Sequence, residues 1–281
     1  MSIRFKSIKM MRYFNNFIFL VIMVSLTGCA NKTDIDLYQE MPIEQIYSQA
    51  VYYLENEKYT EAAEEFLEVE TQYPYSDWAE KAIMMAAYSY FKKNDHNQTI
   101  ITCERYISLH PNSTNAAYAS YLIGMSYYLQ IPKIGRDQEF SMKALEQFGA
   151  LIEKYPDSDY VRDSILKMDL TNDHLAGEEM EIGRYYLNQN LFIAAINRFK
   201  IVVTHYQRTI HIEEALARLV ESYMALGILS EAQTAAAILG YNYPGSLWYK
   251  ESYDLLQNDG VLPKEDINSW ISKAWRSVKP I

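Results

Sequence analysis

A five-fold repeat is the sequence feature that most constrains how this 281-residue chain can fold. Within Tyr59–Ser76, Ala62, Phe66 and Val69 follow an i, i+4, i+7 spacing, so they share one face of a helix. Pro74 cannot continue that helix, and Ser76 is a favourable N-cap for the next one. The same pattern of three apolar residues, a turn and a hydroxyl residue recurs at turns that contain Pro74, Pro111, Pro156, Gln207 and Pro244.

A second series of residues indicates a preceding helix in each unit. Small or apolar residues stand at the same offset from four of the turns, at Ala50, Ala87, Gly183 and Val220, and at Gly124 in repeat three, where an insertion displaces it. A small residue facing an alanine-containing helix lets two antiparallel helices approach closely, which is typical of tetratricopeptide (TPR) repeats. The sequence therefore predicts an all-α, TPR-like helical-hairpin solenoid of about five repeats. A generic helical bundle with accidental spacing is the alternative.

The spacing of the turns also predicts the organisation of the chain. Repeat three is eight residues longer than repeat two, which fits a loop at 131–138 between its two helices. A helical stretch from Asp159 to about Asn190 is too long for one TPR helix. We expect N-terminal repeats one to three at 43–157, then a connecting helix, repeats four and five and a capping helix at 158–257, and a C-terminal tail at 258–281. The tail contains Trp270 and Trp275, and a terminal helix packing back on the solenoid is one interpretation of it.

The N-terminus predicts export and lipidation. Residues 1–28 carry four basic and no acidic side chains, and their apolar run is too short for a comfortable transmembrane helix. The run ends in Leu26-Thr27-Gly28-Cys29, which resembles the bacterial lipobox. That resemblance implies a diacylglycerol and an N-acyl chain on Cys29, a tether at 29–42, and, because Ala30 follows, an address at the periplasmic face of the outer membrane. A plain signal peptide or anchor with an incidental cysteine is the alternative.

Charge and motif content exclude several classes of function. Removing residues 1–28 reduces the 26 basic residues to 22 against 36 acidic ones, a formal charge of −14, which opposes binding to nucleic acid. Cys103 occupies a buried helix position and is expected to be a packed thiol. We find no catalytic motif, no metal-ligand spacing and no cofactor fingerprint, so we expect a non-enzymatic protein.

The first helices of the repeats are expected to line a concave groove. In repeats one to three the groove positions are rich in aromatic residues and methionine, which suits varied apolar side chains. The candidate client groove comprises Tyr47, Met84, Tyr88, Phe91, Tyr118, Tyr121, Met125 and Tyr128. Lys81 lies beside it and is a candidate for a client carboxylate, or a solvated lysine. The alternative for the whole set is packing between neighbouring repeats.

Three segments carry a resemblance to a known family. They are Gln130–Gln138, Asn172–Tyr186 and Ala194–Phe199. Together with the lipobox and the repeats, they make residues 26–257 similar to the BamD family of outer-membrane assembly lipoproteins, in its alphaproteobacterial form. The sequence departs little from the pattern of the family: His96 and Thr99 weaken repeat two, and Gln207 replaces a turn proline.

The resemblance implies a subunit of the barrel assembly machinery. Its expected partners are the POTRA domains of BamA, other Bam lipoproteins and unfolded outer-membrane protein clients, whose C-terminal signals the N-terminal repeats would receive. Arg184 and Arg198, basic residues in an acidic chain, are the candidates for pairing with POTRA carboxylates; a salt bridge within the solenoid is the alternative. Another envelope TPR lipoprotein, scaffolding cell-division or peptidoglycan enzymes, is the rival function.

Overall fold

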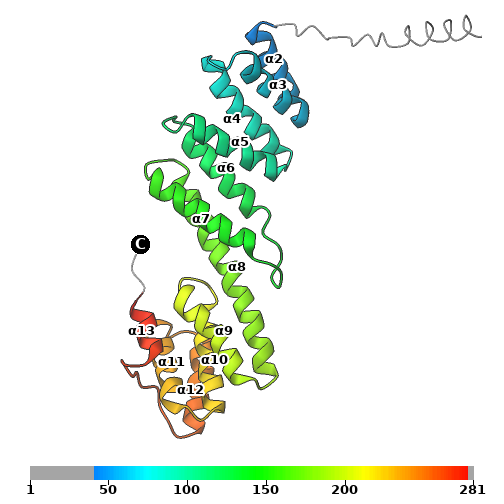
Figure 1. Cartoon of the computed structure of the whole chain (residues 1–281). Helices are drawn as coiled ribbons and strands as arrows, with labels where there is room; N and C mark the ends of the chain where they lie inside the picture. Colours follow the sequence, from blue (N-terminus) through cyan, green and yellow to red (C-terminus); the bar gives the residue numbers. More distant parts are fainter. Residues whose placement is uncertain (1–40, 278–281) are drawn as a thin grey trace, which may run out of the picture. The chain divides into compact units, whose positions relative to one another are not determined.

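Residues 41–277 are described by a computed structural model, and over this range the chain folds into successive helical hairpins (Figure 1). The predicted signal peptide and Cys29 lie outside the described residues. The five hairpins are α2 (Ile43–Glu55) with α3 (Tyr59–Gln72), α4 (Asp77–Lys92) with α5 (His96–Leu109), α6 (Ala116–Tyr128) with α7 (Glu139–Lys154), α8 (Val161–Asn188) with α9 (Phe192–His205), and α10 (Ile212–Ala225) with α11 (Leu229–Asn242). Each helix from α2 to α11 packs on the next one in the chain, so the predicted all-α, TPR-like fold is confirmed.

The repeat positions form the interior of the hairpins. The phenylalanines at the middle position of three second helices, Phe66, Phe148 and Phe199, are fully buried. Fully burying a side chain of this size stabilises the fold by about 1.5–3 kcal/mol relative to leaving it exposed. Gly124 and Gly183 lie directly against two of these rings, because a Cβ atom at either glycine would come within 3 Å of Phe148 or Phe199. The small residues of the first helices therefore permit the close helix contact that the sequence predicted.

The turns inside the hairpins rely on left-handed backbone conformations. Glu57, Asn94, Asn190 and Gly227 each follow a first helix and have φ between 58° and 72°. A residue of this conformation ends a helix and satisfies its last carbonyl groups. In repeat three, the predicted loop replaces the tight turn and ends where α7 begins at Glu139.

The turns between repeats differ in part from the prediction. Ser76 and Ser246 cap α4 and α12, accepting hydrogen bonds from Ala79 N and Trp248 N. The other hydroxyl residues of the series are not N-caps: Ser113, Ser158 and Thr209 stand before an additional turn that precedes α6, α8 and α10. Ser113 and Ser158 accept instead from backbone N–H groups two residues later, which stabilises the turn itself.

The C-terminal part of the chain completes the stack. Helix α8 runs uninterrupted for 28 residues, as its length in the sequence predicted. Helix α12 (Leu247–Asn258) packs on α10 and α11, and α13 (Trp270–Arg276) packs on α9 and α11. Trp270 Nε1 donates to Tyr223 Oη at 2.9 Å, and Ile271 is fully buried. The interpretation that the tail packs back onto the repeats is therefore the correct one.

No helix within residues 41–277 is both long enough and apolar enough to span a membrane.

Candidate functional site

The residues predicted to line a client groove are largely used by the fold. All eight lie on the first helices α2, α4 and α6, and each is buried or half-buried. Met84 is only 6% exposed. Tyr47 lies edge-on between Phe66 and Trp78, with ring centroids 5.2 Å and 4.8 Å apart. The Tyr47–Trp78 contact is the packing between neighbouring repeats that was noted as the alternative from the sequence, and the Tyr47–Phe66 contact lies within repeat one.

Two of the tyrosines belong to the junction between repeat three and α8. Tyr118 and Tyr121 both stack on Tyr160, at centroid distances of 5.1 Å and 5.0 Å. Tyr121 Oη donates to Asp163 Oδ2 at 2.6 Å. Burial raises the pKa of Tyr121, and the hydrogen bond and charge of Asp163 raise it further, while burial raises the pKa of Tyr118 to about 12. Sequence reasoning missed Tyr160, although its place two residues after Ser158 was a signal that it lies at a repeat junction.

The remaining aromatic residues present partly open ring surfaces. Tyr88 and Tyr128 are half-buried, and Lys167 Nζ lies 5.1 Å from the centre of the Tyr128 ring. Trp78, at the start of α4, is 38% exposed, and Lys81 Nζ lies 6.0 Å from its ring. Trp78 is a residue that the groove prediction did not include. Trp78, Tyr88 and Tyr128 on the N-terminal repeats are thus each partly open, and fewer aromatic side chains are available than the sequence suggested; we call these three the open aromatic surface.

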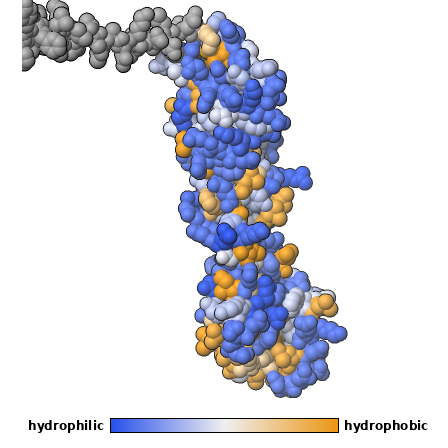
Figure 2. Space-filling view, turned by 90° about the vertical axis from the view of Figure 1, so that its right-hand side faces the viewer, coloured by the Kyte–Doolittle hydropathy of each residue, from blue (hydrophilic) through white to orange (hydrophobic). Residues whose placement is uncertain are grey.

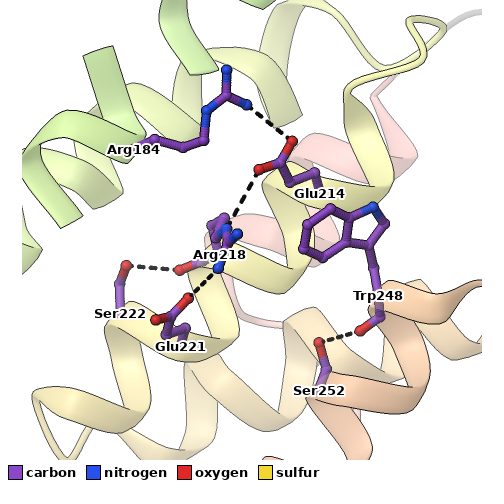
Figure 3. Close-up of polar contacts among 7 residues, drawn as sticks. All are labelled: Arg184, Glu214, Arg218, Glu221, Ser222, Trp248 and Ser252. Atoms are coloured by element: carbon purple, nitrogen blue, oxygen red, sulfur yellow. Dashed lines mark hydrogen bonds and ion pairs between the residues drawn. The ribbon is translucent and has the colours of Figure 1, made fainter. Parts of the chain in front are cut away.

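The first helices of the last two repeats carry an alternating ladder of charges. Arg184 Nη1 on α8 contacts Glu214 Oε2 on α10 at 3.0 Å, and Glu214 Oε1 faces Arg218 Nε at 3.4 Å (Figure 3). Arg218 Nη1 then contacts Glu221 at 2.8 Å. The Arg218 guanidinium also lies over Trp248 of α12, 5.0 Å from the ring centre. This arginine–glutamate ladder, Arg184–Glu214–Arg218–Glu221, joins α8 to α10, and Arg218 adds a cation–π contact with α12.

Both arginines predicted to meet a partner have acceptors within the chain. Arg198 Nη1 contacts Glu179 Oε2 at 3.2 Å, joining α9 to α8, and Arg184 belongs to the ladder. Their side chains are 37% and 38% exposed, whereas Glu179 and Glu214 are 20% and 16% exposed. The salt bridge within the solenoid, the alternative noted from the sequence, is thus present for both. The exposed part of each guanidinium is what a partner could still reach.

An apolar surface at the hairpin turns of repeats four and five was not foreseen from the sequence. Leu191, Ile193 and Leu226 are 52%, 69% and 37% exposed, and with Phe192 they line a shallow cavity of about 460 Å³. We call these four residues the turn patch. Figure 2 shows apolar residues scattered among hydrophilic ones on one face of the molecule, including over the C-terminal repeats. No charged residue occurs between Tyr185 and Arg198 in the sequence, which was the available signal.

Comparison with known proteins places the chain in a family. The sequence model of the YfiO family, described as outer membrane lipoprotein, matches residues 39–238. The chain is 43% identical to outer membrane protein assembly factor BamD of Rickettsia prowazekii, covering 85% of this chain and 95% of that one. It is 41% identical to the Caulobacter vibrioides protein of the same name, over 87% and 81% of the two chains. The chain belongs to the BamD family.

Family membership confirms the resemblance read from the sequence. The more distant BamD of Neisseria meningitidis is 30% identical over 79% of this chain. The two alphaproteobacterial relatives are more similar than that, as expected. The BamD relatives are named as assembly factors of outer membrane proteins, which is a non-enzymatic role, and the family is one of outer membrane lipoproteins.

Proposed function

We propose that this BamD-family protein is a lipid-anchored subunit of the barrel assembly machinery that binds a POTRA domain of BamA and the C-terminal signals of unfolded clients. The observation that carries the proposal is 41–43% identity to proteins named BamD over most of the chain. Anchoring through acylated Cys29 at the periplasmic face of the outer membrane is part of the proposal. A pull-down of this protein from detergent-solubilised membranes should recover a BamA-like barrel protein. Recovery of cell-division or peptidoglycan enzymes in its place would favour the rival scaffold.

The client site of this proposal lies on the open aromatic surface of the N-terminal repeats. Tyr88 and Tyr128 have half-buried rings, and Trp78, on the same helix as Tyr88, has an exposed indole. Aromatic rings supply large contact area with little loss of rotamer freedom, so they suit an extended peptide that ends in an aromatic residue. The affinity is modest because a flexible client segment must be ordered on binding.

Fluorescence anisotropy with a labelled peptide ending in Phe tests the client site. Tyr88→Ala should weaken binding, and deleting the terminal Phe of the peptide should weaken it to the same degree. Tyr121→Phe is the matched control, because it removes only the hydroxyl that bonds to Asp163 and leaves the ring in place. Equal binding by a folded Tyr88→Ala variant would move the client site elsewhere.

The BamA site of the proposal combines the outer edges of Arg184 and Arg198 with the turn patch. Each arginine side chain is more than one-third exposed, so a POTRA carboxylate can share its guanidinium with the internal glutamate. The uncharged turn patch supplies apolar area, which drives association where charge alone contributes little. The expected interface is therefore a small apolar contact bordered by charge pairs.

Co-purification tests this interface. The Arg184→Glu, Arg198→Glu double variant should lose BamA, because it reverses two charges in the contact. Arg105→Glu is the matched control, because Arg105 in repeat two forms a comparable ion pair with Glu70 in repeat one at 2.8 Å. Full retention of BamA by the double variant, or equal loss with the control, would remove these arginines from the interface.

A further inference from the structure

A cavity of about 310 Å³ lies between α10 and α12, next to the arginine–glutamate ladder. Helix α10 contributes Ala217, Arg218 and Glu221, and helix α12 contributes Trp248, Glu251 and Leu255. This volume is at the lower end of the range for ligand pockets, and it suits one long side chain better than a larger organic ligand. We call this cavity the α10–α12 socket; Figure 3 shows the Arg218, Glu221 and Trp248 side chains that form part of its wall.

The charge of the socket favours a cation. Its walls hold two carboxylates and one guanidinium, and that guanidinium is already shared between Glu221 at 2.8 Å and Glu214 at 3.4 Å. Glu251 is exposed, and the described part of the chain gives it no ion-pair partner. An anion entering the socket would meet Glu221 and Glu251, whereas a cation would neutralise the surplus negative charge.

The apolar walls favour a side chain with a long stem. Ala217, Leu255 and the indole of Trp248 surround the space beside the carboxylates. Lysine and arginine bury their methylene stems along apolar surface while the charged head reaches polar groups. Arg218 already binds in this way within the chain. Its guanidinium lies 5.0 Å from the centre of the Trp248 ring, and its Nη1–H group donates to the carboxylate of Glu221.

We propose that the α10–α12 socket binds an arginine side chain of a partner protein, with lysine as a weaker occupant. The guanidinium would pair with Glu251 and the free edge of Glu221, and its stem would lie against Leu255 and Trp248. Arginine is preferred because its planar head both stacks on an indole and hydrogen-bonds to carboxylates, which an ammonium group does less well. This inference concerns a site separate from Arg198 and the turn patch, and it does not rest on the proposed BamA or client contacts.

The indole N–H of Trp248 reports on the socket directly. The experiment titrates the ¹⁵N-labelled protein, residues 30–281, with N-acetyl-arginine methylamide and follows the indole signals, assigning Trp248 by its loss in Trp248→Phe. The matched probe is N-acetyl-citrulline methylamide, which has nearly the same shape and no charge. The expected result is a saturable shift of the Trp248 signal with the arginine probe, a weaker one with the lysine analogue and none with citrulline.

Substitutions separate binding from stability. Glu251→Gln removes the unpaired carboxylate without breaking an ion pair described in the chain, and it should weaken the arginine probe about fivefold. Glu265→Gln, which alters the exposed pair with Arg276 beyond the socket, should change nothing. Equal shifts with the citrulline probe, or unchanged binding of the arginine probe by Glu251→Gln, would overturn the proposal. The absence of any shift of the Trp248 signal would overturn it too, because no external arginine would then enter the socket beside Arg218.

Discussion

At the scale of single residues, two glycines control how closely the hairpin helices approach. A Cβ atom added to Gly124 would lie 2.6 Å from Phe148 Cε1, and a Cβ atom added to Gly183 would lie still closer to Phe199 Cε1. Both rings are fully buried, so they have no free space into which to move. The contact is therefore intolerant of even one methyl group.

Gly124→Ala should lower the free energy of unfolding by about 1–3 kcal/mol, because overpacking outweighs the gain in helix propensity. Urea denaturation measures the change. Gly149→Ala is the control: this glycine lies in α7 with no atom within 4 Å of the added methyl group, and it should leave stability unchanged or raise it by up to about 1 kcal/mol. A Gly124→Ala variant as stable as wild type would contradict the helix register.

A second residue-scale feature is the carboxylate of Glu80, which ties α4 to the turn before α6. Ser113 Oγ and Tyr106 Oη donate to Glu80 Oε1 at 2.6 Å and 2.9 Å. These hydrogen bonds, that of Ser113 foremost, hold the pKa of Glu80 below its ordinary value of 4.5. A carboxylate with a lowered pKa stabilises the fold above its unfolded pKa, and this contribution is lost as pH falls through the folded value.

Ser113→Ala should therefore destabilise the protein by about 1 kcal/mol near neutral pH, allowing for the partial exposure of Glu80, and by less in acid, where Glu80 is protonated. Urea unfolding near neutral pH and at a pH well below 4.5 compares the two conditions. Ser48→Ala, which removes an exposed hydroxyl bonded only to a backbone carbonyl, should show no such dependence on pH. A constant difference for Ser113→Ala across pH would contradict the role assigned to Glu80.

At the scale of elements, α13 is a short helix that depends on its contacts. It has seven residues, too few to be stable alone, and it packs on α9 and α11 through the fully buried Ile271. Ser269 caps it and also donates to Glu231 Oε2 at 2.5 Å. The last repeats thus depend on a segment that lies beyond the repeat pattern.

Ile271→Ala should destabilise the C-terminal repeats by about 2–5 kcal/mol, because it leaves a cavity under α13. Repeat proteins distribute stability between neighbours, so hydrogen exchange should accelerate in α9 and α11 and remain unchanged in α2 and α3. Ile267→Ala is the control, since Ile267 is 59% exposed a few residues earlier. Uniform acceleration throughout the chain would show that the stack unfolds as a single cooperative unit.

At the scale of the whole molecule, attachment to the membrane is proposed to depend on one cysteine. The chain has two, Cys29 and Cys103. Cys103 is fully buried in α5, and burial raises the pKa of its thiol to about 12, so it is unreactive in the folded protein. Cys29, in the lipobox-like segment, is therefore the proposed acceptor for acyl chains.

Cys29→Ser should abolish incorporation of a clickable fatty acid and release the protein from the outer-membrane fraction, because a hydroxyl is a poor substitute for the thiolate in thioether formation. Two or more acyl chains are needed for stable anchoring, so the loss should be close to complete. Cys103→Ser, with Cys29 intact, should keep its label. Equal labelling of Cys29→Ser and wild type would refute the lipobox interpretation.

The sequence alone determined the hairpins and their register. Apolar residues at fixed offsets mark a helix face, a proline ends the helix, and a small residue on the first helix permits the close approach of two helices. Because these are short-range properties, they could be read from Ala62, Phe66, Pro74 and Gly124 without coordinates. The resemblance to the BamD family likewise rested on local segments, and comparison confirmed it.

Only the tertiary structure decided which of those side chains remain available for binding. Tyr118 and Tyr121 are taken up by Tyr160 and Asp163, and Arg184 is taken up by Glu214, although each pair is 30 or more residues apart in the chain. Whether an aromatic or charged side chain on a first helix meets solvent or the next repeat depends on the rotation and spacing of two hairpins. That geometry arises from the packing of whole helices, and no local pattern of residues specifies it.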